Sequence, residues 1–149
     1  MSEVVAKAVQ LLLVEDNPGD VRLTQEAFKD SHVHCDLHVV TDGEQALDFL
    51  FRRGAFQNAP KPDLILLDLN LPRRNGREVL AELKRDSVLS SIPVVILTTS
   101  QAEEDVARAY QLHANCYISK PVDFEQFMKV VRCIDEFWLT VVRLPPTET

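Results

Sequence analysis

The sequence predicts an α/β fold of (βα)5 type, in which five parallel strands form one doubly wound sheet with helices on both faces. The first observation is that short apolar runs recur at regular intervals along the 149 residues. The second is that a segment of helical length follows each run. Strands of a parallel sheet are buried on both faces and therefore read as continuous apolar runs. The alternation of the two kinds of segment indicates this architecture.

The expected strands show little polar alternation. They are LLLV (11–14), LHVV (37–40), LILL (64–67), VVIL (94–97) and CYI (116–118). The expected helices place apolar side chains three and four residues apart, as one buried helical face requires. They cover residues 20–30, 43–53, 76–86, 102–112 and 123–142. Turn residues such as the Asn75–Gly76 pair separate the elements.

Composition limits the classes of protein to which the chain can belong. It suits a single domain over 1–149, with a core from about 10 to 144 and a short disordered tail. The net charge of −7 disfavours nucleic acid, because phosphate contacts need clustered Lys and Arg. No apolar stretch approaches the ~20 residues that span a membrane. Three widely spaced cysteines, an odd number, predict reduced thiols in a cytoplasmic protein.

Polar and charged residues stand where four of the expected strands end. They are Glu15 and Asp16, Asp68, Thr98 and Lys120, at the ends of the first, third, fourth and fifth strands. Ligands of open α/β sheets bind beyond the carboxyl ends of the strands, so these side chains should converge. Taken singly, the hydroxyl and the ammonium would be ordinary surface groups. Their combination with three carboxylates indicates a functional site.

The residue types indicate phosphoryl chemistry with a divalent cation. A buried run that ends in Asp68 needs a compensating charge, because an unpaired carboxylate is costly to remove from water. Lys120 and a cation can supply it, and oxygen ligands without His or Cys suit Mg²⁺ rather than zinc. Asp carboxylates can act as nucleophiles by forming aspartyl phosphates. No general base is visible, so the phosphoryl donor must already be activated.

Four motifs, in this order, resemble the receiver domain of two-component response regulators. They are LVEDNPGD, LLDLNLPRRNG, IPVVILTTS and CYISKPVD. The resemblance runs from about Leu11 to about Leu144 and implies the flavodoxin-like receiver fold. It implies a phosphoryl group received from a sensor histidine kinase. It also implies a signalling protein rather than an enzyme, apart from Mg²⁺-dependent self-phosphorylation and self-dephosphorylation.

The same resemblance implies the phosphoacceptor and the metal ligands. Asp68 is then the phosphoacceptor. Mg²⁺ would be bound by Glu15, Asp16, Asp68 and the backbone carbonyl group of Asn70.

The resemblance also implies the residues that bind phosphate and switch the conformation. Thr98 would be the switch hydroxyl and Tyr117 the switch aromatic. Lys120 would bind phosphate, and the peptide bond before Pro121 would be cis. Thr99 stands where the family usually has a small residue, and its hydroxyl and methyl groups would restrict water beside the phosphate.

Longer stretches are similar to the small response regulators that partner cyanobacterial phytochromes. They are LDLNLPRRNGREVLAELK, YQLHANCYISKP and FWLTVVRLP. This similarity implies a phytochrome as the sensor kinase. Few residues follow the last expected helix, so we expect output by contact with a downstream protein that the sequence does not name.

Three other classes remain as alternatives. A haloacid-dehalogenase-like phosphatase also uses a nucleophilic Asp at a strand end, but it needs a second Asp where this chain has Asn70, and its acidic pair comes late. A phosphorylation-independent interaction module would not need intact Asp68, Thr98 and Lys120. A nucleotide-binding fold would need a Gly-rich loop after the first strand.

The last expected helix carries more apolar residues than one sheet face can cover. One stripe seats it on the sheet: Phe124, Phe127, Val131, Ile134, Trp138 and Val141. A second set, about 100° around the helix, contains Val130, Cys133 and Phe137. We therefore expect a homodimer through a surface of Phe124, Phe127, Val130, Cys133, Phe137 and Trp138. The alternative is that the fourth helix or the C-terminal tail covers this patch.

Overall fold

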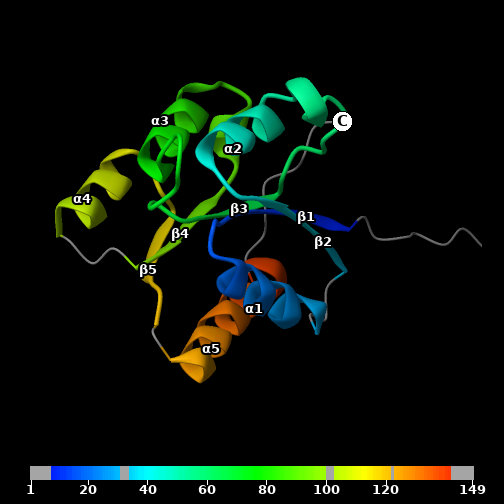
Figure 1. Cartoon of the computed structure of the whole chain (residues 1–149), viewed down its shortest axis with the longest axis vertical. Coiled ribbons are helices and arrows are strands. Elements are labelled where there is room, and N and C mark those ends of the chain that lie inside the picture. Colours follow the sequence, from blue (N-terminus) through cyan, green and yellow to red (C-terminus); the bar gives the residue numbers. More distant parts are fainter. Residues whose placement is uncertain (1–7, 31–33, 100–102, 122, 142–149) are drawn as a thin grey trace, which may run out of the picture.

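The computed structural model describes residues 8–30, 34–99, 103–121 and 123–141, and within these ranges the expected parallel sheet is confirmed. Its strands are β1 (Val9–Val14), β2 (Cys35–Val40), β3 (Leu64–Leu67), β4 (Val94–Thr98) and β5 (Cys116–Ser119). All pairings are parallel, in the order β2-β1-β3-β4-β5 (Figure 1). The order reverses between β1 and β3, and such a switch point is where doubly wound sheets bind their ligands.

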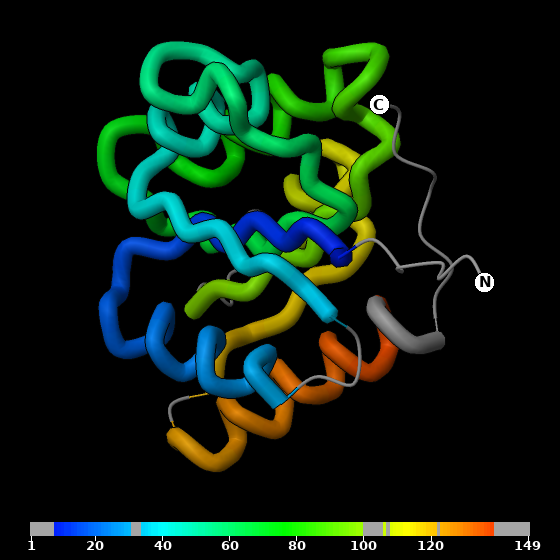
Figure 2. The backbone as a smooth tube through the Cα atoms, turned by 90° about the vertical axis from the view of Figure 1, so that its right-hand side faces the viewer, coloured from blue at the N-terminus to red at the C-terminus, as the bar shows by residue number. Residues whose placement is uncertain are grey.

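Helices cover both faces of the sheet (Figures 1 and 2). On one face lie α1 (Pro18–Lys29) and α5 (Phe124–Ile134); on the other lie α2 (Gly43–Leu50), α3 (Gly76–Arg85) and α4 (Glu103–Gln111). Successive β1 residues divide between the two layers: Leu11 and Leu13 pack in the α1/α5 core, and Leu12 and Val14 in the opposite core. Burial on both faces explains the apolar runs. None of the helices in the described ranges is long and apolar enough to cross a membrane.

Side-chain caps fix where four of the helices begin. Asn17, Asp42, Asn75 and Asp123 each accept a hydrogen bond from a backbone N–H in the first turn of the following helix. Such a cap satisfies an N–H group that would otherwise lack a partner. Because each of these helices follows a strand, the caps set the short connections at the carboxyl edge of the sheet.

The C-terminal helix differs from its sequence-based prediction. An uninterrupted helix was expected to about Val142, but α5 ends at Ile134 and the chain continues as the π-helical segment η3 (Asp135–Val141). A π-helix closes i→i+5 hydrogen bonds and so has more residues per turn. The apolar spacing of three and four residues therefore no longer keeps one face beyond Ile134. The expected end at Val142 lies outside the described residues.

Gly76 allows α3 to start directly against the end of β3. A Cβ atom at this position would lie 2.3 Å from the carbonyl oxygen of Asp68 and 2.6 Å from the Cα of Leu69. The backbone N–H of Gly76 also donates a hydrogen bond to the Leu69 carbonyl oxygen at 3.0 Å. This close approach fixes the residue that ends the strand.

Gly76→Ala should destabilise the fold by about 1–3 kcal/mol, because the added methyl group overlaps backbone atoms that cannot move independently. Urea unfolding measures the change. Gly19→Ala is the matched control, because its Cβ would meet a movable side-chain oxygen of Asn17 at 3.2 Å and the loss should be smaller. Wild-type stability of the Gly76 variant would contradict the close packing.

Candidate functional site

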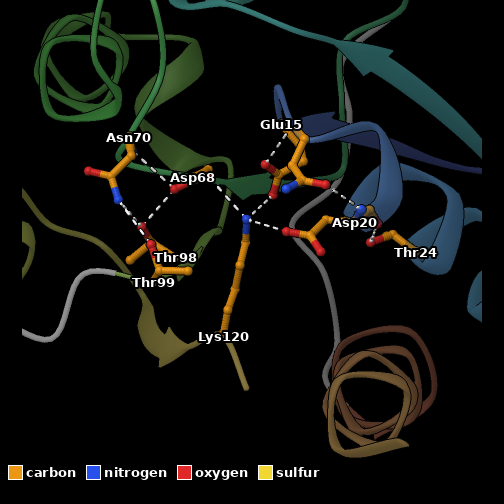
Figure 3. Close-up of polar contacts among 9 residues, drawn as sticks. Glu15, Asp20, Thr24, Asp68, Asn70, Thr98, Thr99 and Lys120 are labelled. Carbon is orange, nitrogen blue, oxygen red and sulfur yellow. Dashed lines mark hydrogen bonds and ion pairs between the residues drawn. The ribbon is translucent and has the colours of Figure 1, made fainter. Parts of the chain in front are cut away.

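The side chains that follow the strands converge at one edge of the sheet (Figure 3). The parallel register produces this convergence, because β1 ends level with β3 and β4 ends level with β5. Backbone hydrogen bonds continue the pairing beyond the strands. Asp68 N donates to the Val14 carbonyl oxygen at 3.0 Å, and Lys120 N donates to the Thr98 carbonyl oxygen at 2.7 Å.

Asp68 is 5% exposed, and both of its carboxylate oxygens have partners. Oδ1 accepts hydrogen bonds from Thr98 Oγ1 at 2.6 Å and from Asn70 N at 3.0 Å. Oδ2 accepts a hydrogen bond from Lys120 Nζ at 3.0 Å. These donors compensate for the removal of the carboxylate from water and explain how a charged residue ends a buried strand.

Lys120 is 6% exposed, and its ammonium group contacts three carboxylates. It forms ion pairs with Glu15, with Asp20 at 2.9 Å and with Asp68 at 3.0 Å. Burial alone would lower the pKa of Lys120, but hydrogen bonds to Glu15 and Asp20 and the charges of Glu15 and Asp68 together raise it above its ordinary value. The ammonium is therefore a permanent positive charge in the site.

One ammonium does not balance the carboxylates around it. Glu15 is 3% exposed; burial and the charge of Asp68 raise its pKa to about 7, although the hydrogen bond from Lys120 and that residue's charge act in the opposite direction. A raised carboxyl pKa means that the ionised form lacks stabilisation. Three carboxylates contact one ammonium here, so a cation beside them would offset the remaining negative charge.

Three of the carboxylates are arranged so that they could hold such a cation. Glu15, Asp16 and Asp68 each offer an oxygen atom, and these atoms all lie within 4.8 Å of one another. Asp16 is exposed, which leaves room for water ligands. An all-oxygen donor set with water fits a hard divalent cation. The role of the Asn70 carbonyl group as a further ligand stays a prediction.

The structure adds two contacts that the sequence analysis did not identify. Asp20, in the first turn of α1, joins the ion-pair cluster around Lys120. The side-chain amide of Asn70 donates to Thr98 Oγ1 and to Thr99 Oγ1, each at 3.3 Å. The NPGD turn could have indicated Asp20. An acidic residue in the first turn of a helix that follows the Glu15–Asp16 pair lies near that pair.

The switch role expected of Tyr117 stays a prediction, and one expectation about the backbone near it needs correction. Tyr117 on β5 pairs with Ile96 and packs against the core beneath α2, α3 and α4. The peptide bond before Pro121 is not cis, because the described residues contain no cis peptide bond. That part of the prediction is wrong; the trans form is the lower-energy state for most X–Pro bonds.

The expected partner surface on α5 divides between the core and two grooves. Phe127 is 3% exposed and belongs to the core, so its place on this surface is corrected. Phe124 is 62% exposed and lines a groove between α1 and α5. A second groove, of 540 Å³, lies between β5 and the C-terminal helix; its lining includes Val130, Cys133, Phe137 and Trp138.

A buried aspartate lies beside a lysine, a hydroxyl group and two further carboxylates, at the edge of a parallel sheet with the strand order 2-1-3-4-5. This combination is the one expected of a receiver domain. The family model for the response regulator receiver domain matches residues 11–132. The chain belongs to the response regulator receiver-domain family. This membership sets aside the haloacid-dehalogenase-like and nucleotide-binding alternatives.

Individual relatives are similar over nearly the whole chain. Response regulator Rcp1 from Synechocystis sp. is 50% identical over 135 residues, which cover 91% of this chain and 92% of Rcp1. The Mn²⁺-bound structure of Rcp1 superposes with a TM-score of 0.91 at 48% identity, over 93% of this chain and 99% of that one. The phosphorylated cyanobacterial phytochrome response regulator RcpA gives a TM-score of 0.92 at 48% identity, over 94% and 100%.

A divalent cation should stabilise the folded protein against urea. Binding to the native state alone adds about 2.7 kcal/mol at a hundredfold excess over Kd. Asp16→Asn should remove most of this gain with little change in metal-free stability, because Asp16 is an exposed side chain. Unfolding with and without Mn²⁺ or Mg²⁺ checks the prediction. Asp36→Asn, at the opposite end of the sheet, is the control and should be stabilised by the cation as the wild type is. If the cation did not stabilise the Asp36 variant, the effect would come from non-specific binding.

Proposed function

We propose that this receiver accepts a phosphoryl group on Asp68 from a phosphohistidine of a sensor kinase, with Mg²⁺ bound, and signals by contact with other proteins. The observation that carries the proposal is the setting of Asp68. Its carboxylate ends β3, bonded through one oxygen to Thr98 and through the other to Lys120, next to the acidic pair Glu15 and Asp16.

The transfer would use a carboxylate oxygen of Asp68 as the nucleophile. Its bond to phosphorus forms as the P–N bond of the phosphohistidine breaks, and the electron pair of that bond returns to the imidazole. Lys120 would pair with one phosphoryl oxygen and Thr98 would donate a hydrogen bond to another. Mg²⁺, held by Glu15, Asp16, Asp68 and the Asn70 carbonyl group, would neutralise charge on the phosphoryl oxygens.

The same site would take phosphoryl groups from small activated donors and lose them to water. No other catalysis is expected, since phosphoryl transfer here needs positioning rather than a strong general base. The Thr99 side chain, next to the switch hydroxyl and hydrogen-bonded to Asn70, would limit the approach of water. It would therefore lengthen the life of the phosphorylated state.

Phosphorylation would move the Thr98 hydroxyl from Asp68 to the phosphoryl group. The Tyr117 ring would then turn into the space that the hydroxyl leaves, changing the face formed by α4, β5 and α5. A change of this kind is a two-state equilibrium biased by new contacts to the phosphoryl group. The half-buried position of Tyr117 above the α4 side of the core supports the proposal.

The sensor kinase is proposed to be a phytochrome. The support is the similarity to RcpA, which is described as a cyanobacterial phytochrome response regulator, over nearly the whole chain. The protein would act in the cytoplasm, with a downstream partner protein and without nucleic acid or membrane as partners. The net charge of −7 supports the exclusion of nucleic acid.

A homodimer is proposed through the groove between β5 and the C-terminal helix. β5 is an edge strand of the sheet, so another chain can approach it directly. Phe137 is 53% exposed and makes a T-shaped contact with Trp138, with ring centroids 5.7 Å apart. Trp138 is half-buried against the core. An exposed phenylalanine that packs on such a ring beside an apolar groove is typical of the centre of an interface. A second copy related by a two-fold axis would bring the two grooves together.

Asp68→Asn should abolish phosphorylation by a phosphohistidine kinase while the domain stays folded, because the amide keeps the shape of the side chain but is not a nucleophile. Labelling with radioactive phosphate measures the transfer, and circular dichroism checks the fold. Asp36→Asn is the control and should accept phosphate normally. Base-labile label at the wild-type level in the Asp68 variant would falsify the assignment.

Phe137→Asp should convert the dimer into a folded monomer that still accepts phosphate, because a charge in the centre of an apolar interface is strongly unfavourable. Sedimentation at micromolar concentration measures the mass. Phe124→Asp is the matched control. Phe124 is also an exposed phenylalanine, but it lies in α5 and lines the groove with α1, so the dimer should persist. A monomeric wild type, phosphorylated or not, contradicts the dimer.

A further inference from the structure

Asp20 is held rigidly at the edge of the site (Figure 3). Its backbone N–H donates to Asn17 Oδ1 at 3.1 Å, and its carbonyl oxygen accepts a hydrogen bond from Thr24 Oγ1 at 2.7 Å. From this fixed turn of α1, the carboxylate reaches Lys120 Nζ at 2.9 Å with its side chain 24% exposed. The positive end of the helix dipole favours the ionised form of a carboxylate at this position.

The ammonium of Lys120 forms ion pairs with carboxylates that a divalent cation would also need as ligands. It is bonded to Glu15 and Asp68, which are two of the three residues that can hold a divalent ion. An ammonium and a divalent cation repel each other, and both would draw on the carboxylates of Glu15 and Asp68. When the metal binds, Lys120 must therefore give up part of these contacts.

Asp20 does not belong to the group that can hold the metal. The cluster of mutually close oxygen atoms consists of Glu15, Asp16 and Asp68. Asp20 is thus the one of the three carboxylates bonded to Lys120 that remains available to the ammonium once the cation has taken the other two. Without it, the displaced ammonium would keep its charge in a desolvated position with no full counter-charge, which is strongly unfavourable.

We propose that Asp20 is a positioning residue that retains Lys120 at the edge of the site, so that a divalent cation can bind the Glu15 and Asp68 carboxylates. The inference rests on the proposed function, since it assumes that the site binds Mg²⁺. It assigns to the first turn of α1 a part in setting the metal affinity. A simpler role would be that of an acidic residue that stabilises the start of α1.

The two roles differ in what they change. If Asp20 acts through Lys120, Asp20→Asn should weaken Mg²⁺ binding about tenfold, the size typical for loss of a residue that supports a metal site without touching the ion. If Asp20 only stabilises the helix, the variant should unfold at lower urea concentration but bind Mg²⁺ with wild-type affinity. Isothermal titration and urea unfolding of the same samples separate these results.

Two controls isolate the path through Lys120. Glu26→Gln removes one negative charge from an exposed position further along α1 and should leave Mg²⁺ affinity nearly unchanged, because solvent and salt screen it. In a Lys120→Met background, Asp20→Asn should have no more effect than Glu26→Gln. Such a double-mutant cycle measures the interaction between the two residues directly.

The results decide as follows. A tenfold loss that disappears without Lys120 supports the proposal, whereas equal Mg²⁺ affinity of wild type and Asp20→Asn, or a loss that persists without Lys120, overturns it. If Lys120→Met does not fold, a crystal structure of the Mn²⁺-loaded wild type replaces the cycle. The proposal requires that Lys120 Nζ stays within hydrogen-bond distance of the Asp20 carboxylate. A Lys120 ammonium that no longer contacts Asp20 would refute the proposal. A wild type that binds no Mg²⁺ would contradict the proposed function itself.

Discussion

The structure depends on an unequal balance of charge at the carboxyl edge of the sheet. Lys120 is a buried ammonium that faces three carboxylates: those of Glu15 and Asp68, which are also buried, and that of the partly exposed Asp20. The ammonium stabilises each carboxylate at this position. The three carboxylates together nevertheless carry more negative charge than one ammonium can neutralise. Burial, together with the charge of Asp68, raises the pKa of Glu15 in this cluster. The proposed binding of a divalent cation would offset this charge.

The sheet holds this cluster together without any disulfide among the described cysteines. The five parallel strands end at one edge, and side-chain caps fix the starts of α1 and α3, the helices that follow β1 and β3. The start of α3 against β3 is part of this arrangement, since only a residue without a side chain fits between Asp68 and the helix. Rigid placement matters because phosphoryl transfer depends on the positions of charged groups more than on their chemical strength.

The C-terminal helix begins near the site and lines two grooves on the surface of the molecule. Its N-terminal end lies just after Lys120, and its two sides line separate grooves, one with α1 and one with β5. The two exposed phenylalanines of this segment therefore belong to different surfaces. Phe124 lines the groove with α1 and Phe137 the groove with β5, while Lys129 lines both.

The sequence by itself determined the parallel sheet, the five helices and the convergence of Asp68, Thr98 and Lys120. Apolar runs and helical periodicity report burial, and strand ends in this topology meet at one edge. Tertiary structure alone decided which partners each charge has: Asp20 reaches Lys120 across a separation of a hundred residues, and no local pattern encodes that contact. It also decided that Phe127 is core and Phe124 is surface, although both lie on one predicted stripe. Periodicity predicts which side of a helix is apolar. How much of that side is buried depends on the elements packed against it and on the π-helical segment after Ile134.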